Sequence, residues 1–169
     1  EIEEKKEIYG IISQKSSRMN DMVDLLFEYS QLGTAEYKPD ITEFDTAELM
    51  RGIIADNYCD LEEHGIDVDV HIPDSPVVIS ADRRDITRAL TNLIVNTYKH
   101  NPEGTSLYVR MERDGDRCVI TLADNGNDIP QGMDIFEPFV TENTARTTGG
   151  GTGLGLAVTK RIIECHGIS

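Results

Sequence analysis

The chain has 169 residues, with 31 Asp and Glu against 16 Lys and Arg, and a formal net charge of −15. This surplus of acids would repel a phosphate backbone, so we expect no nucleic-acid partner. The apolar runs are far shorter than the roughly 20 residues that a membrane-spanning helix needs. The three cysteines are widely spaced and form no C-x-x-C pair, which favours a reducing, cytoplasmic environment over a disulfide framework or a zinc site.

The first 32 residues predict one long amphipathic helix. Apolar side chains recur there at three- and four-residue spacing, with a single glycine and no proline. Such a helix is about 45 Å long, so we expect its apolar stripe to pack against another helix. The alternative is a core helix of the same domain. Gly33 and Pro39 interrupt both periodicities, which predicts a helical segment over 1–33, a linker over 34–40 and one domain over 41–169.

The elements of this domain follow from its local patterns of apolar and turn residues. We expect, in chain order, a strand at 41–44, a helix capped by Asp45 that runs to about residue 63, strands at 66–72 and 77–79, a helix capped by Asp82 that runs to about His100, strands at 106–112 and 117–123, and a helix at 153–166. This order mixes hairpins with crossovers. It predicts an α/β fold in which a mixed sheet carries helices on one face.

The helix predicted after Asp82 carries polar side chains of a particular kind. Asn92, Asn96 and Lys99 fall at positions i, i+4 and i+7, and His100 lies beside them. Two amides one turn apart offer neutral oxygen ligands to Mg²⁺, and an ammonium a turn further on can bind phosphate oxygens. A solvent-facing stripe is the alternative for this pattern taken alone.

Two further segments favour nucleotide binding. Asp124-Asn125-Gly126 follows a strand, where a carboxylate can accept a hydrogen bond from an amino group such as that of adenine, although the tripeptide alone is more typical of a plain turn. The glycine run 149–155 opens the last helix and presents free N–H groups suited to phosphates. It matches neither the P-loop nor the dinucleotide-binding pattern, and because it leads directly into a helix it is unlike a flexible linker.

Four motifs occur in an order that resembles a known family. They are Asn92-Leu-Ile-Val-Asn96-Thr-Tyr-Lys99-His100, Asp124-Asn-Gly126, Ile135-Phe-Glu-Pro-Phe139 and Gly151-Thr-Gly-Leu-Gly155-Leu156. In this order they resemble the asparagine, first glycine, phenylalanine and second glycine boxes of the sensor histidine kinases. The first 33 residues are similar to the second helix of that family's dimerisation and phosphoacceptor domain. The resemblance implies a two-layer α/β sandwich of the Bergerat type, a mixed sheet packed on three helices, preceded by one long helix.

The resemblance assigns roles in binding ATP to the first two motifs. Asn96 is expected to bind Mg²⁺, and Asn92 to lie near the γ-phosphate. Lys99 and His100 are expected to contact phosphates. Asn92, Asn96 and Lys99 form the expected catalytic set. Asp124 is expected to recognise the adenine amino group, with Gly126 allowing the base to approach.

The other two motifs are expected to form a lid over the triphosphate. Phe136 and Phe139 would anchor the hinge of a lid over about 140–150, in which Arg146 would be a further phosphate ligand. The second glycine box would close on the triphosphate through Gly151, Thr152, Gly153, Leu154, Gly155 and Leu156.

The resemblance further implies that the chain transfers the γ-phosphoryl group of MgATP to a histidine, for relay to the receiver domain of a response regulator. We expect a homodimer formed through the N-terminal helix in a longer sensor, with this chain on the cytoplasmic side. No histidine precedes His64, so the acceptor must be supplied from elsewhere. The alternatives are a nucleotide-binding signalling module without kinase activity and a gyrase-type ATPase. Gyrase-type enzymes have at the position of Asn92 a Glu that activates water, which an Asn cannot do.

The sequence departs from the family pattern at three places. Asp128 stands where a second glycine of the first glycine box is expected, and the interval from Pro130 to Phe136 is a few residues short. The final strands of the family are expected beyond residue 169. His64, His71 and His166 are predicted to have structural or surface roles.

Overall fold

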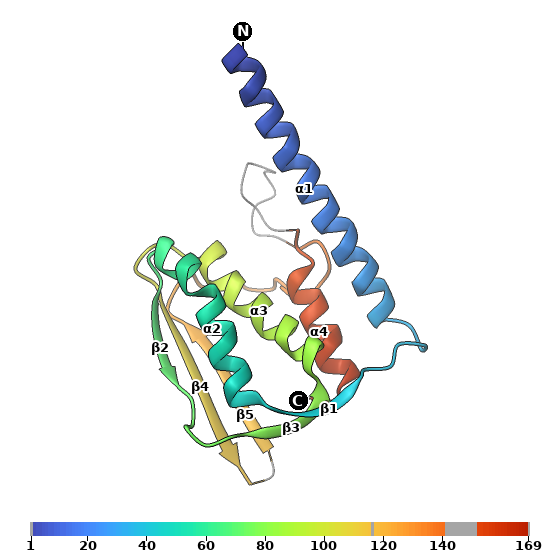
Figure 1. Cartoon of the computed structure of the whole chain (residues 1–169), viewed down its shortest axis with the longest axis vertical. Helices are drawn as coiled ribbons and strands as arrows, with labels where there is room; N and C mark the ends of the chain where they lie inside the picture. Colours follow the sequence, from blue (N-terminus) through green and yellow to red (C-terminus); the bar gives the residue numbers. More distant parts are fainter. Residues whose placement is uncertain (1, 116, 141–151, 169) are drawn as a thin grey trace.

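A computed structural model describes residues 2–115, 117–140 and 152–168 of the chain (Figure 1). The elements in chain order are α1 (Ile2–Leu32), β1 (Ile41–Asp45), α2 (Thr46–Glu63), β2 (Asp67–His71), β3 (Val78–Asp82), α3 (Arg83–His100), β4 (Ser106–Asp114), β5 (Arg117–Asp124) and α4 (Gly155–Cys165). The predicted order of helices and strands is confirmed. Most boundaries agree within two residues, while β3 runs three residues further than predicted.

The strands pair in two separate groups. β2 lies parallel to β4, and β4 pairs with β5 as an antiparallel hairpin. β1 and β3 form an antiparallel pair of their own, in which Ile41 is opposite Asp82. The predicted mixed α/β architecture is therefore confirmed, and its strands are divided between a three-stranded and a two-stranded sheet.

One apolar core joins α2 and α3 to the strands. β4 alternates along its length, so that Leu107, Val109 and Met111 all point inward and are buried. Met50 of α2 and Ile94 of α3 pack in the same cluster. α4 packs against α3 on one side and against α1 on the other. This stacking fixes the start of α4 beside α3, where the polar motif residues lie.

Aspartates cap both helices of the core, as the sequence predicts. The Asp82 carboxylate accepts hydrogen bonds from the backbone N–H groups of Arg84 and Asp85 at 2.9 and 3.3 Å. Asp45 caps α2 through the N–H of Ala47 at 3.0 Å. The start of α3, which carries Asn92, is therefore stabilised by its cap.

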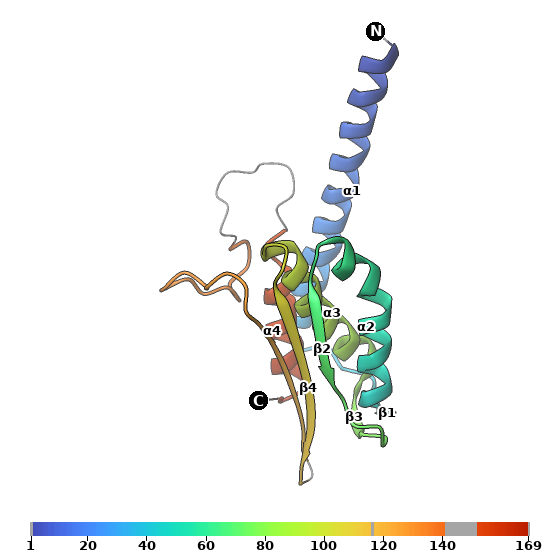
Figure 2. The ribbon, with the colours of Figure 1, turned by 90° about the vertical axis from the view of Figure 1, so that its left-hand side faces the viewer.

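α1 is attached to the rest of the molecule by its C-terminal part only. Leu32 is buried in a small cluster with Ala89 of α3 and with Val158 and Ile162 of α4. The rest of the helix projects away from the domain in both views (Figures 1 and 2). Its exposed apolar side chains include Ile8, Tyr9, Ile11, Ile12, Met19, Val23, Leu26 and Phe27. None of the helices in the described part of the chain is long and apolar enough to span a membrane.

Candidate functional site: a polar cavity between α3 and α4

A cavity of about 650 Å³ lies where α3, the end of β5 and the start of α4 meet. The loop after β5 forms another wall, and three residues of α1 complete the lining. The predicted site residues that line the cavity are Asn92, Asn96, Lys99, His100, Asp124, Thr152, Gly153, Gly155 and Leu156. The fold therefore brings together motif residues that are up to about 60 positions apart in the sequence.

The remaining predicted residues are placed differently. Gly126, Phe136, Phe139 and Leu154 are not part of the cavity lining, and the side chain of Leu154 is fully buried in the core. Arg146 and Gly151 lie outside the described residues, as does the predicted lid from residue 141 onward.

The amide side chains of α3 differ in how they are held. Asn92 donates a hydrogen bond from Nδ2 to the carbonyl oxygen of Gly155 at 3.1 Å, which ties α3 to the first turn of α4. Among the described residues, Asn96 and Lys99 have no side-chain hydrogen bond or ion pair. Both residues line the cavity, where their polar groups are available to a ligand.

The turn after β5 is held by Asn101, which the sequence analysis did not single out. Asp124 accepts a hydrogen bond from the N–H of Gly126 at 3.0 Å, and Asn101 Oδ1 accepts one from the N–H of Asn127 at 2.8 Å. A Cβ on Gly126 would lie 2.0 Å from Asn101 Oδ1. Any larger residue at position 126 would therefore force the Asn101 side chain to move, which is a reason for glycine separate from the predicted approach of a base.

The start of α4 lines the cavity and has no side-chain cap among the described residues. Its N-cap residue is Leu154, which provides no side-chain cap. Thr152 Oγ1 accepts the N–H of Leu154 at 3.3 Å. Uncapped N–H groups and the positive end of a helix dipole attract anions. The binding of phosphates by this segment stays a prediction.

Phe139 and Gly153 join the two ends of the segment between the β5 loop and α4. The N–H of Phe139 donates to the carbonyl oxygen of Gly153 at 2.9 Å. Both residues have positive φ angles, 66° and 69°. Phe139 thus lies at the base of the predicted lid. Asp128 has no positive φ, so an aspartate at the position of the expected glycine does not strain the backbone there.

Three residues of α1, namely Asp21, Met22 and Leu25, also line the cavity. Neither spacing nor motif in the sequence indicates this, because the contact depends on how α1 lies against α4. The loop after β5 supplies further lining through Ile135, which belongs to the third motif, and through Asn127, Ile129 and Met133, which the sequence analysis missed. Met and Ile side chains at this wall suit the flat apolar face of a base better than a phosphate.

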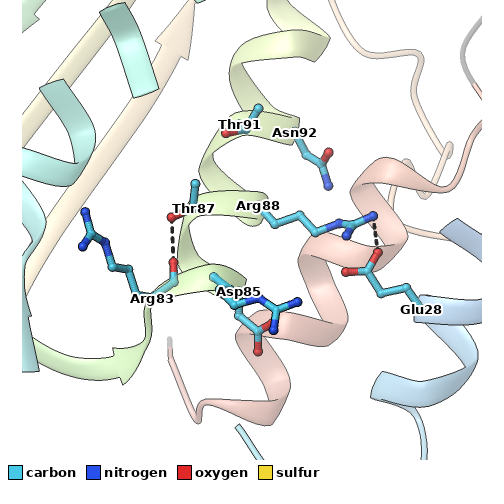
Figure 3. A pocket seen from close by; sticks show the side chains of 8 residues that line it. Glu28, Arg83, Asp85, Thr87, Arg88, Thr91 and Asn92 are labelled. Carbon is cyan, nitrogen blue, oxygen red and sulfur yellow. Dashed lines mark hydrogen bonds and ion pairs between the residues drawn. The ribbon is translucent and has the colours of Figure 1, made fainter. Parts of the chain in front are cut away.

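A second cavity, of about 450 Å³, lies on the other side of Asn92, where α1 meets α3 (Figure 3). There Arg88 of α3 forms an ion pair with Glu28 of α1. Burial raises the pKa of the Glu28 carboxyl, and the Arg88 charge partly opposes this rise. Close by, the Tyr37 hydroxyl donates to Asp85 at 2.5 Å. Polar contacts thus reinforce the apolar attachment of α1.

The described residues contain no group of three or more His, Cys, Asp or Glu side chains that could hold a metal ion by themselves. Mg²⁺ does not need one, since it is usually bound by one or two protein oxygens together with nucleotide phosphates and water. The unpartnered amide of Asn96 in the cavity fits this mode of binding. It does not fit a metal held by protein ligands alone.

An α/β domain with a mixed sheet and a cavity lined by amides, a cation, a carboxylate and an uncapped helix start belongs to the class of nucleotide-binding domains. Residues 81–169 match the family described as histidine kinase-, DNA gyrase B- and HSP90-like ATPases. This match covers more than half of the chain. The chain therefore belongs to this ATPase family, as a catalytic ATP-binding domain of the histidine kinase type.

The similar proteins are sensor kinases. The chain is 31% identical to the alginate biosynthesis sensor protein KinB of Pseudomonas aeruginosa, over 92% of this chain and 26% of KinB. It is 33% identical to the sensor protein GtcS of Aneurinibacillus migulanus, over 94% of this chain and 43% of GtcS. The chain thus spans less than half the length of these relatives.

A solved structure shares the fold over nearly the whole chain. It is that of the histidine kinase ThkA in complex with the response regulator protein TrrA, with a TM-score of 0.74 and 25% identity. The alignment covers 96% of this chain and 45% of the ThkA chain. The predicted α/β fold is confirmed, and so is the resemblance to sensor histidine kinases.

Proposed function

We propose that this chain is the catalytic part of a sensor histidine kinase, which binds MgATP in the cavity between α3 and α4 and transfers the γ-phosphoryl group to a histidine. The observation that carries this proposal is the convergence of Asn92, Asn96, Lys99 and Asp124 with the uncapped start of α4 in one cavity. The gyrase-type alternative is not favoured, because the relatives are sensor kinases and Asn92 cannot act as a base toward water.

The proposed chemistry needs positioning and charge neutralisation more than covalent help. Asn96 would share Mg²⁺ with the phosphates, and the metal would neutralise their charge. Asn92 would lie near the γ-phosphate, and Lys99 and His100 would contact phosphate oxygens. Asp124 would accept a hydrogen bond from the adenine amino group. The acceptor imidazole is itself the nucleophile, so no strong base is required in this domain.

The same proposal extends to the longer protein. Residues 1–33 would be the second helix of a dimerisation and phosphoacceptor hairpin, 34–40 the linker and 41–169 the catalytic domain. The exposed apolar side chains of α1 support a homodimer formed through this helix. The complex of ThkA with TrrA supports a response regulator as the next phosphoryl acceptor. The chain would then be the cytoplasmic part of a sensor that a membrane segment elsewhere can anchor.

Calorimetric titration of the chain with MgATP tests the nucleotide site. Asp124→Asn keeps the oxygen that accepts from Gly126 but turns an amino group toward the adenine, so affinity should fall roughly tenfold or more, as expected for a lost hydrogen bond to a charged group. Asp114→Asn, the same change at the far end of the β4–β5 hairpin, is the control. No binding by the unmodified chain would refute the proposal.

Phosphoryl transfer is tested by adding a separately prepared phosphoacceptor domain of a sensor kinase and radiolabelled ATP. Acid-labile, base-stable label on the acceptor is the expected result. Binding of ATP without transfer would favour a non-catalytic signalling module. Rapid release of free phosphate without the acceptor would favour an ATPase.

A further inference from the structure

Thr159 of α4 faces Asn92 across the contact between α4 and α3. The residue is only 1% exposed, and its hydroxyl donates to the carbonyl oxygen of Gly155 at 3.0 Å. Asn92 Nδ2 donates to the same carbonyl at 3.1 Å and lies 3.4 Å from Thr159 Oγ1. Figure 3 shows the Asn92 side chain directed from α3 toward α4. The three groups thus form a closed hydrogen-bonded triangle between the helices.

The chemistry of the triangle fixes the orientation of the Asn92 amide. A backbone carbonyl only accepts hydrogen bonds, and the single proton of the Thr159 hydroxyl is given to Gly155. Both groups that α4 presents to Asn92 are therefore acceptors, so the amide must turn its NH₂ group toward α4. Asn92 Oδ1 is left without a donor among the described residues, on a side chain that lines the nucleotide cavity.

We propose that Thr159 is a positioning residue, whose hydroxyl holds the Asn92 amide with Oδ1 toward the bound nucleotide. This inference rests on the proposed function of the cavity. Phosphate oxygens are acceptors and repel an amide oxygen, whereas Mg²⁺ and the water bound to it attract one. The orientation therefore favours ATP that carries its metal over metal-free ATP. Thr159 contributes to this preference without touching the nucleotide.

Two substitutions separate the hydroxyl from the methyl group of Thr159. Thr159→Val keeps the shape of the side chain and removes the hydroxyl, while Thr159→Ser keeps the hydroxyl and removes the methyl. ATP affinity is measured by calorimetry with excess Mg²⁺ and again with EDTA. In Thr159→Val the ratio of the two affinities should fall about three- to tenfold, the effect of one neutral hydrogen bond. In Thr159→Ser the ratio should stay at the wild-type value.

A second measurement needs no nucleotide. In ¹⁵N-labelled chain, the side-chain NH₂ signals of Asn92 are identified by their absence from the spectrum of Asn92→Asp. Because these protons are hydrogen-bonded to α4, they should exchange slowly with water in the wild type and in Thr159→Ser. They should exchange faster in Thr159→Val.

Three outcomes would overturn the inference. An unchanged metal preference in Thr159→Val would mean that the hydroxyl serves only the internal bonding of α4. An equal fall in Thr159→Ser would mean that packing of the methyl group is what matters. A wild-type chain that binds no ATP would overturn the proposed function together with this inference. The first two results would overturn the inference alone.

Discussion

Phe139 and Gly153 show how single residues set the geometry at the base of the predicted lid. Phe139 is the only non-glycine residue with a positive φ in the described part of the chain. A left-handed conformation costs an L-residue about 1–2 kcal/mol. Its N–H bond to Gly153 helps to offset that cost. The backbone of Phe139 also passes so close to Gly153 that an ideal Cβ there would lie 2.9 Å from two of its backbone atoms.

Gly153→Ala should therefore destabilise the chain more than an ordinary glycine substitution in a left-handed position. Gly132 is the matched control, because its φ is +82° and a Cβ there would meet nothing within 4 Å. Gly132→Ala should lower the free energy of unfolding by about 1–2 kcal/mol. Gly153→Ala should lower it by roughly 1–3 kcal/mol more, because the Phe139 backbone must move. Urea unfolding measures both, and equal losses would show that the close approach can be relaxed.

The residue types of the site could be predicted from the sequence. Some of the contacts that make those residue types necessary could not. Asn92, Asn96 and Lys99 lie on one helix, so their spacing alone placed them together. Gly126 was predicted from a turn motif, whereas the side chain that a Cβ there would meet is that of Asn101, 25 positions earlier. Such a contact across the fold leaves no trace in local spacing.

At the scale of elements, the carboxylate of Asp82, the last residue of β3, bonds both to the first turn of α3 and to the residue just before β1. One oxygen caps α3, and the other accepts the backbone N–H of Asp40, just before β1, at 2.8 Å. Burial raises the pKa of Asp82, but the N–H groups of Asp40, Asp85 and Arg84 outweigh it and hold the pKa below its ordinary value of 3.8. The ionised carboxylate is thus part of the folded structure.

The stability that the Asp82 carboxylate contributes should disappear in acid. Because its pKa is lowered on folding, the contribution is complete above the ordinary pKa of 3.8 and is lost as the pH falls through the lowered value. Asp82→Asn still caps α3 but loses the acceptor for Asp40. It should unfold about 1 kcal/mol more easily than the wild type near neutral pH.

That difference should shrink as the pH falls below about 4, because the carboxyl is protonated first in the unfolded chain and only at lower pH in the folded one. Urea midpoints across this pH range provide the measurement. Asp114→Asn is the control, because Asp114 has no side-chain hydrogen bond or ion pair among the described residues. A gap between wild type and Asp82→Asn that stays constant down to about pH 2 would contradict the linkage.

Elements and their caps were predictable because their signals are local. Asp45 and Asp82 stand directly before apolar periodic stretches, and the alternation over 66–72 marks β2. The division of the strands into two sheets was not predictable, because pairing joins segments far apart in the chain. The same holds for the packing of Leu32 against α4, because of which one end of α1 resembles a core helix while the other end projects from the domain (Figure 1).

At the scale of the whole molecule, the net charge of −15 constrains how a polyanion can bind. Among the described residues, Lys99 is the one permanent cation in the cavity lining, while Asp21 and Asp124 also face it. The long-range field of the chain and these carboxylates both repel ATP. Much of the compensating positive charge must therefore come from the metal.

ATP affinity should accordingly depend strongly on Mg²⁺. We expect ATP to bind at least tenfold more tightly with excess Mg²⁺ than with EDTA, because one charge pair near a protein surface is worth several kcal/mol at an effective dielectric constant of about 20. Calorimetry under the two conditions gives the ratio, and adenosine, which carries no phosphate, is the control that should show no difference. Equal ATP affinities would contradict this account of the charge.

Because α1 is attached to the domain at one end only, a small tilt at that end corresponds to a large displacement of the free end. Its 31 residues span about 46 Å at 1.5 Å per residue. A tilt of about 10° at the attached end would carry the free end through roughly 8 Å, by the same helix geometry. The attached end also contributes Asp21, Met22 and Leu25 to the cavity wall. By this geometry, a displacement of several ångströms at the far end of α1 corresponds to a rotation of only a few degrees at the wall of the cavity between α3 and α4.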